Sequence, residues 1–243
     1  MAGAAAVDGE EFAETSPGRG QGAPDRVWYA AYGSNMSLAR LARYLRGGVA
    51  PGAARAHPGC RDPRPPERSV PVTLPGLLYF ATRSPVWGGG RAFYDPGVAE
   101  EETPARAHLL TLGQFSDIAA QEMGRAPGRD LALGDGLLRP GGSARLGPGR
   151  YETLVCAGEL AGLPVLTFTA PWDSGDVPWL APSAGYLRQL GDGLVEGRGW
   201  SPARAAHYLA TRPGARGHWD PAAVRALLDT PAEWPAGRGR PWS

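Results

Sequence analysis

The tetrapeptide Tyr32-Gly33-Ser34-Asn35 is the segment whose residue types and spacing point most directly to chemistry. It stands between an apolar run at 27–31, typical of a buried strand, and a stretch from Leu38 onward with helical hydrophobic spacing. Backbone N–H groups at a strand-to-helix turn lack partners, and the positive end of the helix dipole stands behind them. The pattern therefore predicts a site at which backbone N–H groups of this turn bind an anionic group.

Glu122 is the second residue whose position predicts chemistry. Phe115 and Ile118 share one face of an expected helix, and Glu122 is the next residue on that stripe. Burial and the negative end of the helix dipole both disfavour a carboxylate, so we expect a raised pKa, as a general base near neutral pH requires. The alternative is a last-turn Glu that reaches solvent or pairs with a nearby arginine such as Arg125 or Arg129.

The composition excludes several kinds of catalysis. The chain has no Lys, which rules out a Schiff base, a pyridoxal phosphate attachment and a phosphate-loop Lys. Its 4 histidines show no pair at helical spacing, and no Cys-x-x-Cys motif occurs. A metal site would have to be assembled from unrelated segments, so we expect neither a metal nor a cofactor.

The charge and the cysteine content limit the expected binding partners and the expected cellular compartment. The formal net charge is +1, and the arginines are scattered among 24 acidic residues, so nucleic acid is not an expected partner. Cys60 and Cys156 are too few for a disulfide framework, which indicates a reducing, cytoplasmic setting. Acidic residues near the start of the chain and the lack of a long apolar run argue against a signal peptide and against a membrane partner.

Local patterns place the elements that must position these residues. Strand patterns come mostly first and helical patterns mostly last, which predicts an α+β domain with a curved or closed mixed sheet, a small barrel, flanked by helices. We expect a disordered segment at 1–25, the main domain at 26–200 and a helical extension at 201–243 packed on it.

Capping and turn signals refine the boundaries. A helix should end near Arg46 before Gly47-Gly48, and a Thr111-x-x-Gln114 capping box should start the helix that carries Glu122. The remaining expectations are loops at 49–69 and 125–149, strands at 70–80 (interrupted at 75–76), 90–94 and 105–110, a hairpin of 151–158 with 163–170, and helix starts at Ser201-Pro202 and Asp220-Pro221.

Together these residues resemble the γ-glutamylcyclotransferase-like family, whose hallmark is Tyr-Gly-Ser-Asn after a first strand. Further segments match in order over residues 27–200: Trp87-Gly88-Gly89-Gly90-Arg91-Ala92, Gln121-Glu122 at a helix end, Tyr151 before a strand, and Pro182-Ser183-Ala184-Gly185-Tyr186 at a helix start. The chain departs from the family in having Met123 before Gly124, a long loop before Tyr151, and a tail beyond residue 200 with no clear counterpart.

The resemblance implies that the chain cyclises a small-molecule γ-glutamyl amide to 5-oxoproline and releases an amine. The α-amine attacks the γ-carbonyl of the same molecule, so the enzyme has to hold a curled conformer and move protons. Glu122 would serve as the catalytic acid and base, and no cofactor is needed. The leaving amine and the oligomeric state are left open.

The resemblance also implies a substrate pocket. Backbone N–H groups at the turn would hold a carboxylate or oxyanion, tyrosines would form the walls, and the Tyr151 hydroxyl would donate to substrate or to Glu122. Asn35 is expected to brace the turn as a helix-cap residue more than to touch substrate. The implied substrate-binding residues are Tyr29, Tyr32, Gly33, Ser34, Asn35 and Tyr151.

Other functional classes remain open at this point. A non-catalytic module could hold an acidic ligand or a peptide terminus in the same pocket, although a core-facing Glu disfavours an anion there. Amide hydrolysis, including metal-dependent deacetylation, is another alternative. Ser34 as a nucleophile lacks a Gly-x-Ser-x-Gly frame, and it suits a helix cap better.

Overall fold

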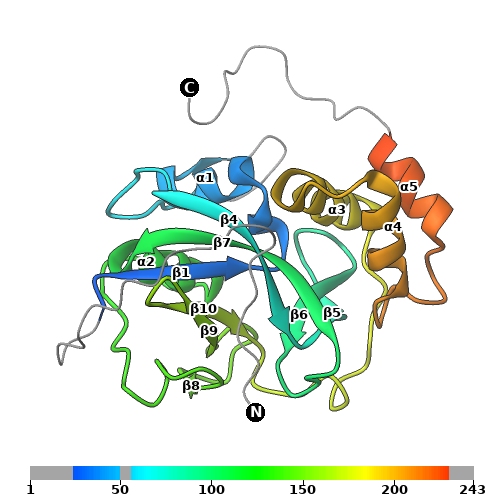
Figure 1. Cartoon of the computed structure of the whole chain (residues 1–243). Helices are drawn as coiled ribbons and strands as arrows, with labels where there is room; N and C mark the ends of the chain where they lie inside the picture. The colour runs from blue at the N-terminus through cyan, green and yellow to red at the C-terminus, as the bar shows by residue number, and fades with distance from the viewer. Residues whose placement is uncertain (1–23, 50–55, 230–243) are drawn as a thin grey trace.

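The computed structural model describes residues 24–49 and 56–229 (Figure 1). Its centre is a six-stranded sheet in the order β4-β7-β1-β10-β9-β8. The strands in that order are β4 (Arg68–Pro75), β7 (Glu102–Thr111), β1 (Arg26–Ala31), β10 (Leu163–Thr169), β9 (Thr153–Leu160) and β8 (Ser143–Arg145). The β1–β10 pair is parallel and the other pairs are antiparallel, so the sheet is mixed.

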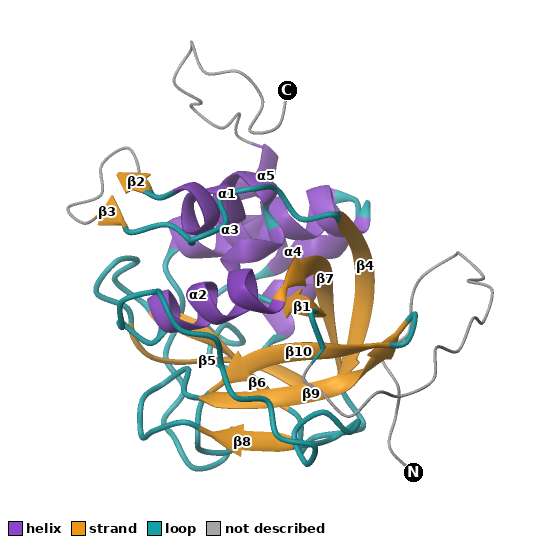
Figure 2. Ribbon diagram, turned by 90° about the vertical axis from the view of Figure 1, so that its left-hand side faces the viewer, coloured by secondary structure: helices purple, strands orange, loops and turns teal. Residues whose placement is uncertain are grey.

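The predicted α+β class and curved mixed sheet are confirmed. The sheet bends so that β4 and β7 run steeply across the direction of β9 and β10 (Figure 2). β4 and β8 form its two edges, so it stays open and does not close into a barrel. Smaller ladders join β2 (Gly48–Val49) to β3 (Ala56–His57) and β5 (Leu77–Arg83) to β6 (Gly90–Asp95).

The part of the chain that the structure describes has five α-helices, which gather along one side of the strands (Figure 2). They are α1 (Leu38–Arg46), α2 (Leu112–Glu122), α3 (Ala184–Arg198), α4 (Pro202–Thr211) and α5 (Pro221–Asp229). The bounds of α1 and the reciprocal capping box of Thr111 and Gln114 agree with the sequence predictions. None of the helices in the described part of the chain is both long and apolar enough to cross a bilayer.

Three local features differ from the predictions. A 3-10 turn, η1 (Ser34–Met36), separates β1 from α1, so the strand does not run directly into the α-helix. The short strand β8 lies inside the segment predicted as a loop at 125–149, and β2 and β3 lie within or beside the one at 49–69. Such short strands carry too few residues for a readable period.

The ends of the chain bear on the predicted domain division. The disordered segment predicted at 1–25 lies almost entirely outside the described residues. At the other end, α4 and α5 both contact α3 (Figure 1), with Leu228 of α5 facing Gly191 of α3. The boundary at residue 200 stays a prediction.

The glycine run after Trp87 allows two distant segments to touch. The N–H of Gly90 donates to the carbonyl of Ala181 at 2.8 Å, and a Cβ on Gly90 would overlap the carbonyl oxygen of Leu180. A Cβ on Gly89 would lie 2.5 Å from the backbone nitrogen of Ser183. Only glycine therefore lets the start of β6 pass this close to the segment that leads into α3.

Gly90→Ala is expected to destabilise the protein by about 1–3 kcal/mol, because the added methyl group must push backbone apart. The matched control is Gly136→Ala, where an added Cβ meets open space. Urea unfolding of both variants checks the difference. Equal stabilities for the two variants would contradict the close-approach explanation.

Candidate active site

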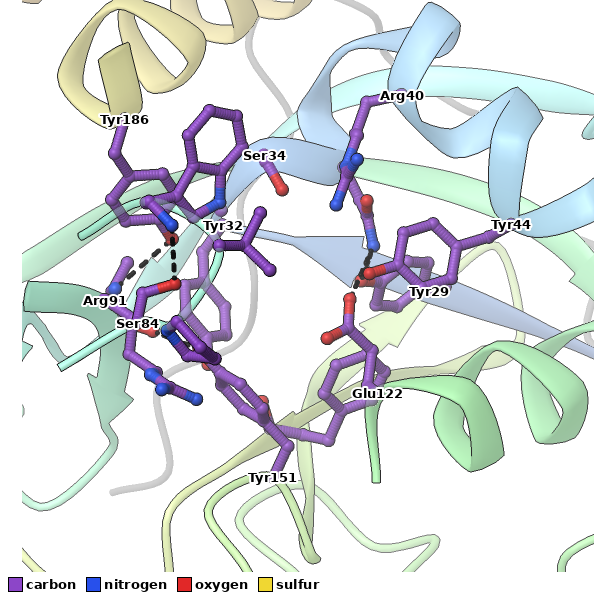
Figure 3. Close-up of a pocket in the computed structure, with 17 residues that line it drawn as sticks. Tyr29, Tyr32, Ser34, Arg40, Tyr44, Ser84, Arg91, Glu122, Tyr151 and Tyr186 are labelled. Carbon is purple, nitrogen blue, oxygen red and sulfur yellow. Dashed lines mark hydrogen bonds between the residues drawn. The ribbon is translucent and has the colours of Figure 1, made fainter. Parts of the chain in front are cut away.

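A cavity of about 190 Å³ opens where the turn after β1, helix α1, the end of α2 and strand β6 converge (Figure 3). This is the scale of a small-molecule site and not of a macromolecular groove. All of the predicted site residues line it: Tyr29, Tyr32, Gly33, Ser34, Asn35, Glu122 and Tyr151.

Glu122, the last residue of α2, points its carboxylate across the cavity toward the turn (Figure 3). The side-chain amide of Asn35 donates to its Oε1 at 3.2 Å. Burial raises the pKa of Glu122, while hydrogen bonds from Tyr44 and Asn35 and the nearby cations limit that rise. The alternative pairing with Arg125 does not form, because that arginine pairs with Glu152.

Asn35 does not cap a helix, so that expectation is wrong. The residues at the cap positions are Gly33 for η1 and Ser37 for α1, and neither makes a side-chain capping bond. Ser34, also expected as a cap, instead begins the 3-10 turn. The Asn35 amide reaches inward to Glu122 and to the hydroxyl of Tyr29, at 3.2 Å each.

Two of the tyrosines that line the pocket already donate their hydroxyl protons to backbone carbonyl groups. Tyr32 donates to the carbonyl of Phe168 at 2.8 Å, and Tyr151 donates to the carbonyl of Ala92 at 3.0 Å. The expectation that Tyr151 donates to Glu122 is therefore wrong, since its single proton is used elsewhere. The ring of Tyr29 stacks on Phe168 with centroids 5.3 Å apart.

Two cations that line this pocket were not predicted from the sequence. Arg40 of α1 and Arg91 of β6 both line the cavity, and the guanidinium of Arg40 lies 5.5 Å from the ring centre of Tyr44 and 6.0 Å from that of Trp87. Arg40 and Tyr44 are spaced i, i+4 on one helix, which was the available signal. Two guanidinium groups facing one carboxylate suit a ligand that carries both signs of charge.

Tyr186 also lines the cavity. It ends the Pro182–Tyr186 segment noted in the sequence, from which no role for it was predicted. Its hydroxyl accepts the N–H of Ala92 at 3.2 Å, and burial raises its pKa to about 12. In accepting that bond the hydroxyl keeps its own proton, so it can donate into the cavity.

Within the residues that the structure describes, no group of three His, Cys, Asp or Glu side chains is placed to hold a metal ion.

Comparison with known proteins gives a curated relative over part of its length and a looser likeness to solved structures. No protein-family model matches the chain. Histone deacetylase 5 of Arabidopsis thaliana is 35% identical over 199 residues, which is 75% of this chain and 30% of that protein. The chain thus spans less than a third of the length of the relative it matches.

Two solved structures align with most of the chain at low structural and sequence similarity. A γ-glutamyl cyclotransferase has a TM-score of 0.45 and 14% identity, over 84% of this chain and 98% of that one. An uncharacterized protein from Homo sapiens has the same TM-score and identity, over 84% of this chain and 99% of that one. Neither comparison identifies a site residue.

Glu122→Gln is expected to stabilise the protein at neutral pH. The folded-state pKa of Glu122 lies above its unfolded value, so the stability this group contributes is lost as pH rises from about 4.3 through the raised pKa. Over that pH window the free energy of unfolding of the variant should exceed that of the wild type, by up to ~1.4 kcal/mol for each pH unit that separates the folded and unfolded pKa values. Urea unfolding across the window measures this, and a pH-independent difference would refute it.

Proposed function

We propose that the chain is a γ-glutamyl cyclotransferase-type enzyme that converts a γ-glutamyl amide into 5-oxoproline and a free amine. The observation that carries this proposal is the hydrogen bond from Asn35 of the Tyr-Gly-Ser-Asn turn to Glu122 inside one cavity. It joins an expected anion-binding turn to an expected proton-transfer group. The curled glutamyl head group requires both at once, because its carboxylate and its amine are attached to the same carbon atom.

Glu122 supplies the proton transfers in this reaction. As a carboxylate it takes a proton from the α-ammonium, and the freed amine attacks the γ-carbonyl carbon to close a five-membered ring. That proton passes from Glu122 to the leaving nitrogen as the γ-carbon–nitrogen bond breaks. The Glu122 carboxylate then takes the second proton of the ring nitrogen and gives it to the released amine, which leaves as an ammonium, so no water is consumed. A pKa raised by burial suits a group that must both accept and return a proton.

The positive charge that holds the substrate carboxylate comes from more than the turn. Because η1 separates the turn from α1, the dipole of the α-helix does not begin directly behind Gly33. Arg40 and Arg91 supply formal positive charge in the same cavity. We therefore assign anion binding jointly to the backbone N–H groups at 32–34 and to these two guanidinium groups.

Asn35 has a second role in this scheme. Its amide nitrogen is engaged by Tyr29 and Glu122, and its Oδ1 is buried with no hydrogen-bond partner among the described residues. A buried acceptor without a partner is costly unless a ligand supplies the donor. The α-ammonium of the substrate, held beside Glu122, is a donor of the right kind for that oxygen.

Amide hydrolysis is a second candidate, because the Arabidopsis relative is named as a deacetylase. Only 30% of that protein is matched, so its named activity need not lie in the matched part. Acetate release from an acetylated peptide by the purified chain would favour hydrolysis. A pure binding module would instead retain γ-glutamyl ligands unchanged.

Glu122→Gln should lower 5-oxoproline formation by about 10²-fold or more, because the amide can neither take nor return a proton. Mass spectrometry over a panel of γ-glutamyl amides measures it, with Glu159→Gln, an exposed carboxyl on β9, as the control. Full activity in the Glu122 variant would contradict its role. No 5-oxoproline from any member of the panel with the wild type would contradict the proposed function.

Arg91→Gln should raise KM roughly ten- to a hundredfold with a smaller effect on kcat, since a charge-assisted hydrogen bond to substrate contributes about 1.5–3 kcal/mol. The exposed Arg145→Gln serves as the control for loss of an arginine. Steady-state kinetics on one active substrate separates the two parameters. An unchanged KM would remove Arg91 from substrate binding.

A further inference from the structure

His108 stands behind the pocket in a row of side chains that crosses the sheet. It lies on β7, directly opposite Tyr29 on β1 and Ser69 on β4. The side chain is fully buried, and its ring centre is 6.2 Å from that of Tyr29. Residues opposite one another on adjacent strands project to the same face, so the sheet register itself brings the three side chains together.

Hydrogen bonds on both ring nitrogens fix the state of this histidine. Nε2 lies 3.1 Å from the carbonyl oxygen of Asn35, and Nδ1 lies 2.8 Å from Oγ of Ser69. A carbonyl can only accept, so Nε2 carries the proton, and Nδ1 then accepts the Ser69 hydroxyl proton. Burial, with repulsion from Arg106, lowers the pKa of His108 to about 3, so the ring stays neutral at physiological pH.

Asn35 needs such support because it belongs to a three-residue 3-10 turn and not to a regular helix. Two members of the row hold it at both ends: His108 binds its backbone carbonyl, and the Tyr29 hydroxyl accepts from its side-chain amide. The same amide donates to Glu122. The orientation of the group that contacts the proposed acid and base is thereby set from the sheet.

We propose that His108 is a positioning residue of the active site: it fixes the Asn35 carbonyl so that the Asn35 amide stays on Glu122, and Ser69 selects the tautomer that does this. The catalytic meaning of this arrangement rests on the proposed function, because Glu122 is the acid and base there. The hydrogen-bond chain from Ser69 to Glu122 does not depend on it.

Other charged and titratable groups lie around Glu122, the residue whose pKa the test measures. They are Tyr44 and Arg40 from α1, Arg91 from β6, Tyr29 from β1, Tyr186 from α3 and Tyr151 before β9. Of these groups, Tyr29 packs against His108, and its hydroxyl is bonded to the same Asn35 amide that contacts Glu122. A shift in the Glu122 pKa on substituting His108 is therefore attributable to the Asn35 amide, whose hydrogen bond lowers that pKa.

The test compares two amides at position 108. His108→Gln can place an N–H where Nε2 lies and keep the bond to Asn35, whereas the shorter His108→Asn reaches only toward Ser69. We expect His108→Asn to raise the Glu122 pKa, move the acid limb of kcat/KM to higher pH and lower kcat roughly ten- to a hundredfold. His108→Gln should keep the Glu122 pKa, the acid limb of kcat/KM and kcat near their wild-type values, even where both variants lose thermal stability.

The carboxyl ¹³C resonance of Glu122, followed by NMR titration, gives its pKa without any turnover. An equal pKa in His108→Asn, His108→Gln and the wild type would overturn the inference and leave His108 as core packing. If the wild type makes no 5-oxoproline, the proposed function fails while this comparison still decides the role of His108.

Ser69→Ala keeps the inference testable if His108→Asn does not fold. It removes one hydroxyl from a partly buried position and frees the ring to take the other tautomer. We expect a smaller rise in the Glu122 pKa in the same direction. If His108→Asn is unfolded, a wild-type pKa in Ser69→Ala overturns the proposal.

Discussion

The partial burial of one carboxylate, that of Glu122, is the constraint on which the rest of the pocket depends. A charge removed from water is costly unless hydrogen bonds and opposite charges replace its hydration. Here the replacements come from separate elements: Asn35 from the turn after β1, Tyr44 and Arg40 from α1, and Arg91 from β6. The packing of α1 against α2 and the bend of the sheet are what bring these groups to one place.

Much of the fold could be predicted because its signals are local. The helix that ends at Arg46, the capping box of Thr111 and the helix starts at Ser201 and Asp220 all follow from short spacings, and each is present. The core-facing stripe on α2 likewise placed Glu122 on the inner side. A stripe predicts which face is buried, but it does not say which residues lie opposite.

The partners of each polar group were beyond local reasoning. Tyr151 donates to a carbonyl on β6, and Asn35 reaches a helix end far along the chain, so neither bond leaves a trace in the neighbouring sequence. His108 shows the limit most clearly. As one of 4 scattered histidines it could be considered only as a metal ligand, whereas its place depends on the register of three strands.

The parallel pairing of β1 with β10 has a consequence for how the molecule is made. Trp28, near the start of the described chain, pairs with Val165, and the wall residue Phe168 lies just beyond that pair. Contacts this distant in sequence close late, because loop-closure entropy must be overcome before they form. During synthesis the Tyr-Gly-Ser-Asn turn therefore emerges long before its pocket can exist. The pocket is complete only after β10 has docked beside β1 and α3 has brought Tyr186 to its wall.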